Sequence, residues 1–378
     1  MSKIQAVQTE KKKNEPIFHI VKRGHQTLFH SVGIRVGAIL LALAFLGVFT
    51  LVLLKENPIT AYKTMFEGVF GNNTAVSLRK AAILLCIALA LTPAFKMRFW
   101  NTGAEGQVLI GAFASAACMF YLRGQSAGVI ITAMLIASVL AGALWGFIPA
   151  FFKAIWGTNE TLFTLMMNSV AACITLFFMR IWNPGKSFVS RETLDPTSEV
   201  SKIFTPDFSA TIIVVTALVA VALLFIYLKY SKHGYEISVV GESENTARYI
   251  GINVRKVIIR TMTISGLICG LTGFLIVAPS QSIASTIVGG QGFTAIMVAW
   301  LAKFNPIVMI LTAFLFIFVS AGGQEISVAL GYDAAYSDVF IGIMLFFIIG
   351  CEFFINYKIE LSTRGKKLFS RNSKKEEN

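Results

Sequence analysis

Three short polar stretches beside apolar segments contain the side chains whose types and spacing could serve binding or transport. The densest, residues 101–107, reads NTGAEGQ. Its two glycines permit irregular backbone, and Glu105 is an ionisable group next to a long apolar run. Because a charge at the bilayer centre costs roughly 2.5–3.5 kcal/mol, such a group is expected to face protein or water. A helix cap at the membrane interface explains the same residues equally well.

The second stretch opens an apolar segment that begins near Leu162. Residues 157–161 read GTNET, in which Asn159 can cap a helix and Glu160 favours the positive end of that helix. Asn168 follows two turns later, inside the apolar run. A buried amide in lipid needs hydrogen-bond partners. Asn168 is therefore predicted either to join two helices or to contact a substrate.

The third stretch, residues 289–293, reads GGQGF. It lacks the Lys-Ser/Thr pair that completes a phosphate-binding loop, and no strand is predicted before it. The sequence contains no other nucleotide-hydrolysis motif, and its five cysteines have no metal-ligand spacing. We therefore predict that the chain is not an enzyme and binds no metal or other cofactor. Any ATP hydrolysis would belong to another chain.

These stretches are embedded in a sequence with the composition of a membrane protein. Hydrophobic residues make up 55% of it and charged residues 14%, with a mean hydropathy of +0.70. Runs of about 20 apolar residues recur, and each is long enough to cross a bilayer. We predict an all-α polytopic protein embedded in a lipid bilayer, and the composition excludes a single soluble core.

About ten apolar segments are predicted to be transmembrane helices. Residues 58–70 have mixed polarity and favour an amphipathic helix on the outer membrane surface. Residues 279–293 are small and polar, so the sequence leaves open whether 279–304 spans the membrane or re-enters it. The ten segments are 34–54, 79–95, 108–122, 128–150, 162–182, 211–227, 261–278, 294–304, 306–319 and 339–354.

The distribution of charge predicts the orientation of these helices. The net charge is +13, and the basic residues gather in the two terminal tails and in residues 229–260. This positive-inside pattern places both termini and 229–260 in the cytoplasm and argues against a nucleic-acid partner. Residues 183–208 are more acidic and are predicted to be extracellular. The sequence is thus divided into a basic tail (1–33), a transmembrane domain (34–356) and a second basic tail (357–378).

The cytoplasmic stretch 229–260 contains signals for one short helix, capped by Ser243 and ended by Gly251. Ala247 and Ile250 are three residues apart and are expected to share one face of it, with Tyr249 beside them. A solvated linker needs no such face, whereas a segment that docks onto another protein does. The predicted docking residues are Glu242, Ala247, Arg248, Tyr249, Ile250 and Gly251.

Four motifs along the sequence resemble one protein family. They are N-x-G-x-E-G-Q at 101–107, G-x-N-E-x-x-x-T-L-M-x-N at 157–168, V-G-E-x-x-x-x-A-R-Y-x-G-I at 240–252 and G-x-G-F-x-A-I-x-V-A at 290–299. In this order they resemble the bacterial ABC importer permeases of the ribose/nucleoside class. The sequence is most similar to the nucleoside permeases that work with a binding protein of the basic-membrane-lipoprotein type. It departs from the family pattern at Trp300, Ala302, Lys303 and Phe304.

This resemblance implies a permease subunit of an ATP-driven importer in the bacterial cell (inner) membrane. Such a subunit has no ATPase site of its own. The implied partners are a cytoplasmic ABC ATPase that docks on 229–260, a second permease subunit, identical or different, and an extracellular substrate-binding lipoprotein. ATP would be used by the ATPase partner. For a nucleoside, with its flat base and polar ribose, stacking and hydrogen bonding are expected along the pathway. The candidate pathway residues are Trp100, Asn101, Glu105, Gln107, Asn168 and Phe293.

Two other functions are compatible with parts of the sequence. A permease of the same class could carry a pentose or another sugar instead of a nucleoside. A secondary transporter or channel that works alone would also be polytopic, but it would have no need for a docking helix within 229–260.

Overall fold

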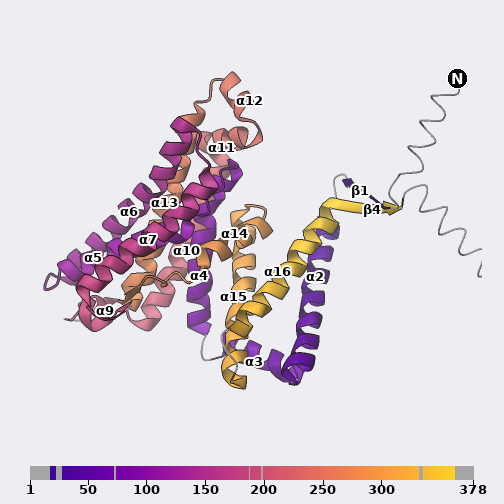
Figure 1. Ribbon diagram of the computed structural model, residues 1–378, viewed down its shortest axis with the longest axis horizontal. Helices are drawn as coiled ribbons and strands as arrows, with labels where there is room; N and C mark the ends of the chain where they lie inside the picture. Colours follow the sequence, from indigo (N-terminus) through magenta and orange to yellow (C-terminus); the bar gives the residue numbers. More distant parts are fainter. Residues whose placement is uncertain are drawn as a thin grey trace, which may run out of the picture. The chain divides into compact units, whose positions relative to one another are not determined.

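The structure is a computed structural model that describes residues 18–22, 28–71, 74–186, 188–196, 199–331 and 335–361. Helices account for most of these residues (Figure 1). The chain divides into two compact units. The terminal unit combines Met1–Thr64 with Ile326–Asn378, and the central unit is Met65–Glu325. The basic tails predicted at 1–33 and 357–378 fall largely outside the described residues.

The central unit is a bundle of long helices. Two short helices, α8 and α9, lie at one end of the bundle, and α11 and α12 lie at the opposite end (Figure 1). In chain order the helices are α4 (Thr74–Lys96), α5 (Ala104–Tyr121), α6 (Ala127–Trp156), α7 (Glu160–Trp182), α8 (Arg191–Leu194), α9 (Glu199–Ile203), α10 (Pro206–Tyr230), α11 (Lys232–Glu242), α12 (Glu244–Tyr249), α13 (Val254–Ser280), α14 (Gln291–Leu301) and α15 (Pro306–Leu330), the last of which ends in the terminal unit.

Among the described residues, seven helices are long and apolar enough to cross a membrane: α4, α5, α6, α7, α10, α13 and α15. This confirms the prediction of an all-α polytopic membrane protein. Each of the ten predicted segments overlaps a helix. The segment predicted at 294–304 coincides with α14, whose 11 residues are too few for a crossing.

Small residues set the packing of α13 against α6 in the middle of the central unit. Gly142 and Gly146 on α6 face Gly266 and Gly270 on α13, and each pair is four residues apart. A Cβ atom added at Gly142 would lie 2.5 Å from the Cα of Gly270. Glycines at this spacing let two helix backbones approach closely, which is how helices associate within lipid.

The chain is not helical between α13 and α14. Most of residues 281–290 form turns, apart from the short strand β3 (Ile283–Ala284). This strand pairs antiparallel with β2 (Phe188–Val189), which belongs to the loop predicted to be extracellular. Ser201 from the same loop is 2.7 Å from the side-chain oxygen of Gln281, Oγ to Oε1. This loop therefore holds the start of the non-helical segment between α13 and α14, which we call the break in the helix.

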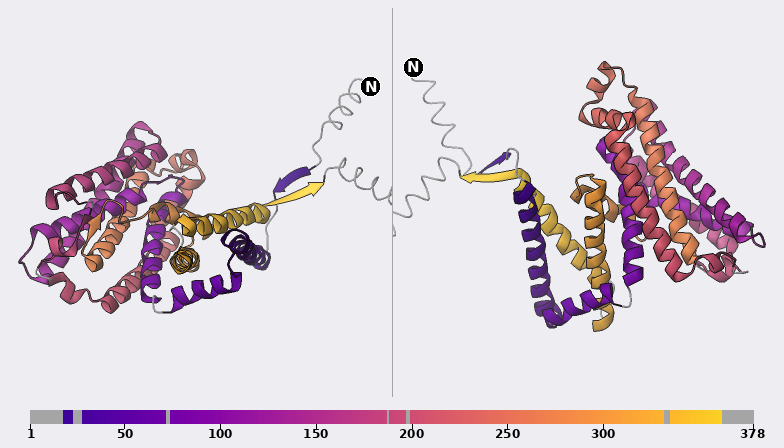
Figure 2. Two further views of the ribbon diagram at one scale, coloured as in Figure 1. Left: turned by 60° about the horizontal axis from the view of Figure 1, so that its bottom comes forward. Right: turned by 180° about the vertical axis from the view of Figure 1, so that it is seen from behind.

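In the terminal unit α2 (Leu28–Phe49) and α16 (Ala335–Asn356) lie side by side (Figures 1 and 2). A π-helical turn, Thr50–Leu54, ends α2, and α3 (Pro58–Phe70) coincides with the amphipathic helix predicted at 58–70. The sequence did not predict the antiparallel pair of strands β1 (Phe18–Lys22) and β4 (Tyr357–Leu361).

The glycine seam between α6 and α13 leads to a stability prediction. Gly142→Ala places a methyl group against the backbone of α13, so we expect a loss of about 1–3 kcal/mol, the usual cost of overpacking. Thermal unfolding of the purified chain in detergent measures it. Gly128→Ala on the same helix is the matched control, because no atom lies within 4 Å of its added Cβ. Equal melting temperatures for the two variants would contradict the packing described here.

Candidate functional site

The predicted residue Asn101 lies in the segment between α4 and α5, Gln107 lies in the first turn of α5, and both side chains are buried. Asn101 is 0% exposed and Gln107 is 1% exposed. The Oδ1 atom of Asn101 accepts hydrogen bonds from the N–H of Gly103 at 3.0 Å and from Nε2 of Gln107 at 3.3 Å. Its Nδ2 atom donates to the hydroxyl of Ser265 on α13 at 3.3 Å. These two side chains therefore shape the turn before α5 and present no open face.

Asn168 connects α7 to the same turn. Its Oδ1 atom accepts a hydrogen bond from the N–H of Gly106, and its Nδ2 atom donates to the carbonyl of Thr102, both at 2.9 Å. Thr164, one turn earlier on α7, accepts a hydrogen bond from the N–H of Thr102 at 3.2 Å. Of the two roles that the sequence left open for Asn168, the structure shows the helix–helix hydrogen bond.

The start of α7 follows the predicted local chemistry. The side chain of Asn159 accepts a hydrogen bond from the N–H of Leu162 at 3.1 Å, which caps the helix. Glu160 in the first turn forms an ion pair with Lys153 at 2.7 Å, and both side chains are partly buried. This ion pair joins the end of α6 to the beginning of α7.

Glu105 reaches from α5 to the segment that the sequence singled out at 289–293. One carboxylate oxygen accepts a hydrogen bond from the N–H of Gly290 at 2.8 Å, and the other accepts from the N–H of Gly292 at 2.7 Å. The first polar stretch is bonded to α7, which carries the second, through Thr102 and Asn168. Glu105 of the first stretch is bonded to the third stretch. All three stretches therefore lie together at the beginning of α5.

Trp100 and Phe293, the two aromatic residues predicted for the pathway, belong to one exposed surface. Phe293, Met297 and Trp300 follow one another on α14 at spacings of four and three residues, so they share a face of the helix. They are 41%, 38% and 50% exposed. The ring of Trp100, 42% exposed, meets that of Trp300 edge-on with 5.3 Å between centroids. We call Trp100, Phe293, Met297 and Trp300 the aromatic face.

Met297 and Trp300 were missing from the sequence-based set of pathway residues. Trp300 stood out only as a departure from the family pattern. The spacing of Phe293, Met297 and Trp300 is a signal that could have identified them, because it marks one side of a helix. The contact with Trp100 could not be found in this way, since it joins two distant parts of the chain.

The stretch 229–260 contains two helices, α11 and α12, where the sequence predicted one. The predicted one is α12. Its cap is Ser243, whose side chain accepts a hydrogen bond from the N–H of Thr246 at 3.2 Å. Arg248 forms an ion pair with Glu244 at 3.2 Å, and Gly251 follows with a left-handed φ of +85°. The local signals for this helix are confirmed.

The exposed face of α12 differs from the face that the sequence predicted. Tyr249 is 93% exposed and Ile250 is 51% exposed, but Ala247 is 0% exposed. Ala247 therefore packs within its own chain, and the prediction that it is a docking residue is wrong. An apolar spacing of three residues does not distinguish packing within a chain from packing on a partner. Glu242, Arg248 and Gly251 are exposed.

The α11–α12 pair is held firmly to the bundle. Glu236 on α11 forms an ion pair with Arg260 on α13 at 2.8 Å. The hydrogen bond from the Arg260 guanidinium holds the pKa of Glu236 below its usual value. A side chain at Gly241 would collide with the carbonyl of Lys96, so the end of α11 rests on the end of α4. The α11–α12 pair is therefore in contact with the end of α4, which leads into the segment that contains Asn101.

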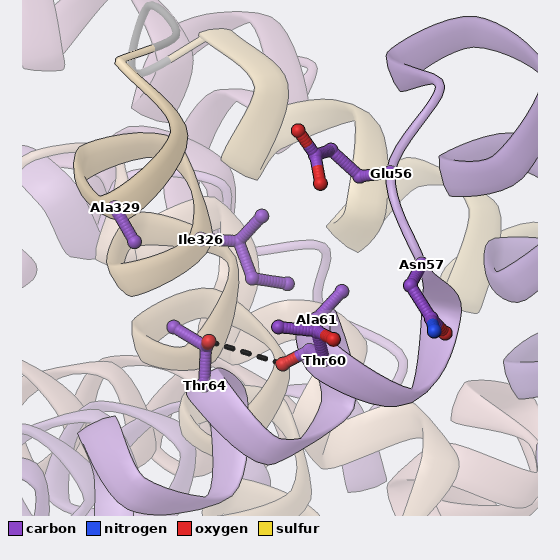
Figure 3. Close-up of a pocket in the computed structure, with 7 residues that line it drawn as sticks. All are labelled: Glu56, Asn57, Thr60, Ala61, Thr64, Ile326 and Ala329. Atoms are coloured by element: carbon purple, nitrogen blue, oxygen red, sulfur yellow. Dashed lines mark hydrogen bonds between the residues drawn. The ribbon is translucent and has the colours of Figure 1, made fainter.

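Two small hollows do not have the size of a substrate site. One, of about 50 Å³, lies where α12 meets the ends of α4, α6 and α7 and is lined by Met97, Arg98, Phe99, Lys153, Glu160, Val240, Glu244 and Ile258. The other, of about 20 Å³, lies in the terminal unit (Figure 3) and has room for about one water molecule. Among the described residues, no group of three or more His, Cys, Asp or Glu side chains could hold a metal ion.

Comparison with known proteins identifies the family. Residues 73–349 match the family described as the permease component of the branched-chain amino acid transport system. The chain belongs to this family. It is 28% identical to a glucose ABC transporter permease of Haloferax volcanii, over 87% of this chain and 90% of the relative. It is also 28% identical to a guanosine ABC transporter permease of Bacillus subtilis, over 82% and 91%. A nucleoside ABC transporter permease of Lactococcus lactis is 26% identical, over 75% and 82%.

The bonds of Asn168 in this permease can be tested by truncation. Asn168→Ala leaves the N–H of Gly106 and the carbonyl of Thr102 without their partner, so we expect a loss of about 1–3 kcal/mol. Ser169→Ala is the control, because Ser169 is the next residue on α7 and is exposed. Thermal unfolding of both variants in detergent gives the comparison. A melting temperature of Asn168→Ala equal to that of Ser169→Ala would refute the bridging role.

Proposed function

We propose that this permease is the membrane-spanning subunit of an ATP-driven importer of nucleosides in the bacterial cell (inner) membrane. It forms the translocation pathway and couples to a separate cytoplasmic ATPase. The observation that carries the proposal is the aromatic face on α14, next to a break in the helix. Family membership supports the transport role, and the guanosine and nucleoside permeases among the relatives support the substrate.

The non-helical segment before α14 supports assigning its exposed face to a pathway and not to lipid. Helix α14 has 11 residues and is about 16 Å long, roughly half of the hydrocarbon core. Non-helical backbone at membrane depth is tolerated only where it is buried in protein or lines a watery cavity. In our proposal residues 281–290 are such backbone, and they lead directly into the aromatic face. Exposed rings at this place suit the stacking of a flat nucleobase.

The hydrogen-bonded residues serve this pathway indirectly in our proposal. Asn101, Gln107 and Asn168 build the turn before α5, and Trp100 emerges from that turn onto the aromatic face. The substrate would therefore meet Trp100, Phe293, Met297 and Trp300. The polar residues would set the position of Trp100.

The proposed orientation follows from the charge distribution and the bundle. We count ten crossings, one for each predicted segment, and treat α14 and the backbone before it as one of them. An even number of crossings puts both termini on the same side, and the basic residues favour the cytoplasm for the termini and for α11 and α12. Helices α8 and α9, at the other end of the bundle, then face outward (Figure 1). In this scheme 34–356 is the permease domain, 183–208 is the extracellular loop, and the tails 1–33 and 357–378 are cytoplasmic.

We propose three protein partners. A cytoplasmic ABC ATPase, which uses the ATP, docks on α12 and the residues beside it, through Glu242, Arg248, Tyr249, Ile250 and Gly251. A second permease subunit, identical or different, forms the other wall of the pathway. An extracellular lipoprotein binds the substrate and delivers it to the outer loop. The chain itself catalyses no reaction and binds no cofactor or metal in this proposal.

A sugar is the second candidate substrate, because one relative is a glucose ABC transporter permease. A nucleoside contains a ribose, so both substrates need hydrogen-bonding groups, but only a nucleoside offers a flat base for stacking. Membership of an ABC permease family argues against a secondary transporter or channel that works alone.

Reconstitution decides between the two substrates. In vesicles that contain this permease, its second subunit and its ATPase, supplied with the binding protein, we expect nucleosides to stimulate ATP hydrolysis and enter the vesicles. Ribose and glucose are expected to do neither. Stimulation by a sugar and by no nucleoside would overturn the nucleoside assignment and favour the second candidate.

The docking surface is tested at Tyr249, which ends α12 and is 93% exposed. Tyr249→Ala is expected to reduce co-purification of the ATPase by about tenfold, because exposed tyrosines at interfaces often contribute 1–2 kcal/mol or more to binding. Tyr121→Ala, which removes a 65% exposed tyrosine at the end of α5, is the matched control. Unchanged recovery of the ATPase with Tyr249→Ala would exclude α12 as the main docking site.

A further inference from the structure

We propose that Glu105 is a positioning residue for transport: its carboxylate holds the beginning of α14, and with it the aromatic face, and does not bind the substrate. The sequence grouped Glu105 with the residues that contact substrate, so this inference changes its role. It rests on the proposed function, because it assigns Glu105 a task within that pathway.

Both oxygens of the Glu105 carboxylate already have partners. The N–H groups of Gly290 and Gly292 donate to them at 2.8 and 2.7 Å, from positions 185 and 187 residues further along the chain. Hydrogen bonds from N–H groups to a carboxylate are stronger than those between neutral groups. A substrate hydroxyl that approached Glu105 would have to share or displace these backbone donors.

Helix α14 has no cap of its own. The residue before it, Gly290, has no side chain that could accept a hydrogen bond, and its φ is +77°. The first N–H groups of a helix lack partners within that helix. Glu105 supplies an acceptor from α5, and its negative charge suits the positive end of the α14 dipole. One helix thus caps another.

The two helices also touch at this point. A Cβ atom added at Gly292 would lie 2.5 Å from the backbone nitrogen of Glu105, so α14 rests directly on the first turn of α5. On its other side, the same turn is bound to α7 through the N–H of Gly106 and Asn168. The first turn of α5 is therefore fixed between α7 and α14.

Release of this bond would free the aromatic face. Phe293 is one residue beyond Gly292, and Trp300 near the other end of α14 meets Trp100. If the Glu105 carboxylate no longer accepts these two hydrogen bonds, α14 loses its cap and its polar link to α5. The rings of α14 can then shift relative to Trp100. The bond between Glu105 and the two glycines sets the geometry of the pathway wall.

Glu105→Gln separates positioning from substrate binding. Glutamine has the same size, but its NH₂ group would face a backbone N–H donor, so one of the two hydrogen bonds cannot form. Hydrogen–deuterium exchange of the purified chain in lipid nanodiscs then reports on the amides of residues 289–293. We expect them to exchange about tenfold faster in Glu105→Gln, since one of the two hydrogen bonds that protect them is lost.

Uptake by the full transporter complex provides the second measurement. For Glu105→Gln we expect the maximal rate to fall about tenfold and the substrate concentration for half-maximal uptake to stay the same. Glu105→Asp keeps the charge on a shorter side chain and should recover part of the rate. Glu56→Gln, the same chemical change at an exposed residue before α3, should alter neither uptake nor the exchange at 289–293.

Two results would overturn the proposal. Unchanged exchange at 289–293 in Glu105→Gln would show that the carboxylate does not hold α14. A raised half-maximal concentration with an unchanged maximal rate would make Glu105 a substrate contact. Glu105→Asp gives both measurements if Glu105→Gln is not recovered folded. If the wild-type complex carried no nucleoside, the proposed function would fail while the exchange experiment still judged the role of Glu105.

Discussion

Our proposed pathway puts the non-helical segment between α13 and α14 at membrane depth, where no water is available to backbone polar groups and their hydrogen-bond partners must come from protein. The structure meets this demand at both ends of the break. At its start, β3 pairs with β2, and Gln281 meets Ser201. At its end, the N–H groups of Gly290 and Gly292 donate to Glu105. Glu105, which looks unusual beside so apolar a run, is thus one of the groups that satisfy this segment.

The elements around the break form one continuous series of contacts through the central unit. Helix α11 rests on the end of α4 at Gly241, and the segment after α4 carries Trp100 and leads into α5. Helix α5 holds α14 through Glu105, and the backbone before α14 is paired with the loop that contains β2. Such a series is a physical route by which an event at α12 could reach this loop at the opposite end of the bundle.

Close packing of α6 and α13 gives these contacts a rigid support. Glycines on both helices bring the backbones together, and α13 also contacts α4 and α5. In lipid, van der Waals contact of this kind replaces the hydrophobic effect as the force that associates helices. The proposed pathway residues Trp100 and Glu105 stand beside this closely packed pair of helices, on the segment before α5 and on α5 itself.

Much of the fold was predictable because its signals are local. Apolar runs mark the long helices, and Asn159 and Ser243 mark helix starts, since a cap acts on an N–H group only three residues away. Helix α11 and the β1–β4 pair were missed. The two strands are separated by more than three hundred residues, and nothing within either strand indicates its partner.

The sequence by itself determined the class of protein, the apolar segments, the caps and the four motifs, because each depends on composition or on neighbours along the chain. Only the tertiary structure decided which way each side chain faces. It turned Ala247, Asn101 and Gln107 inward and left Trp300 exposed. It also gave Glu105 two partners from the far side of the sequence. The physical reason is that burial and hydrogen bonding between helices depend on their packing, which no local spacing specifies.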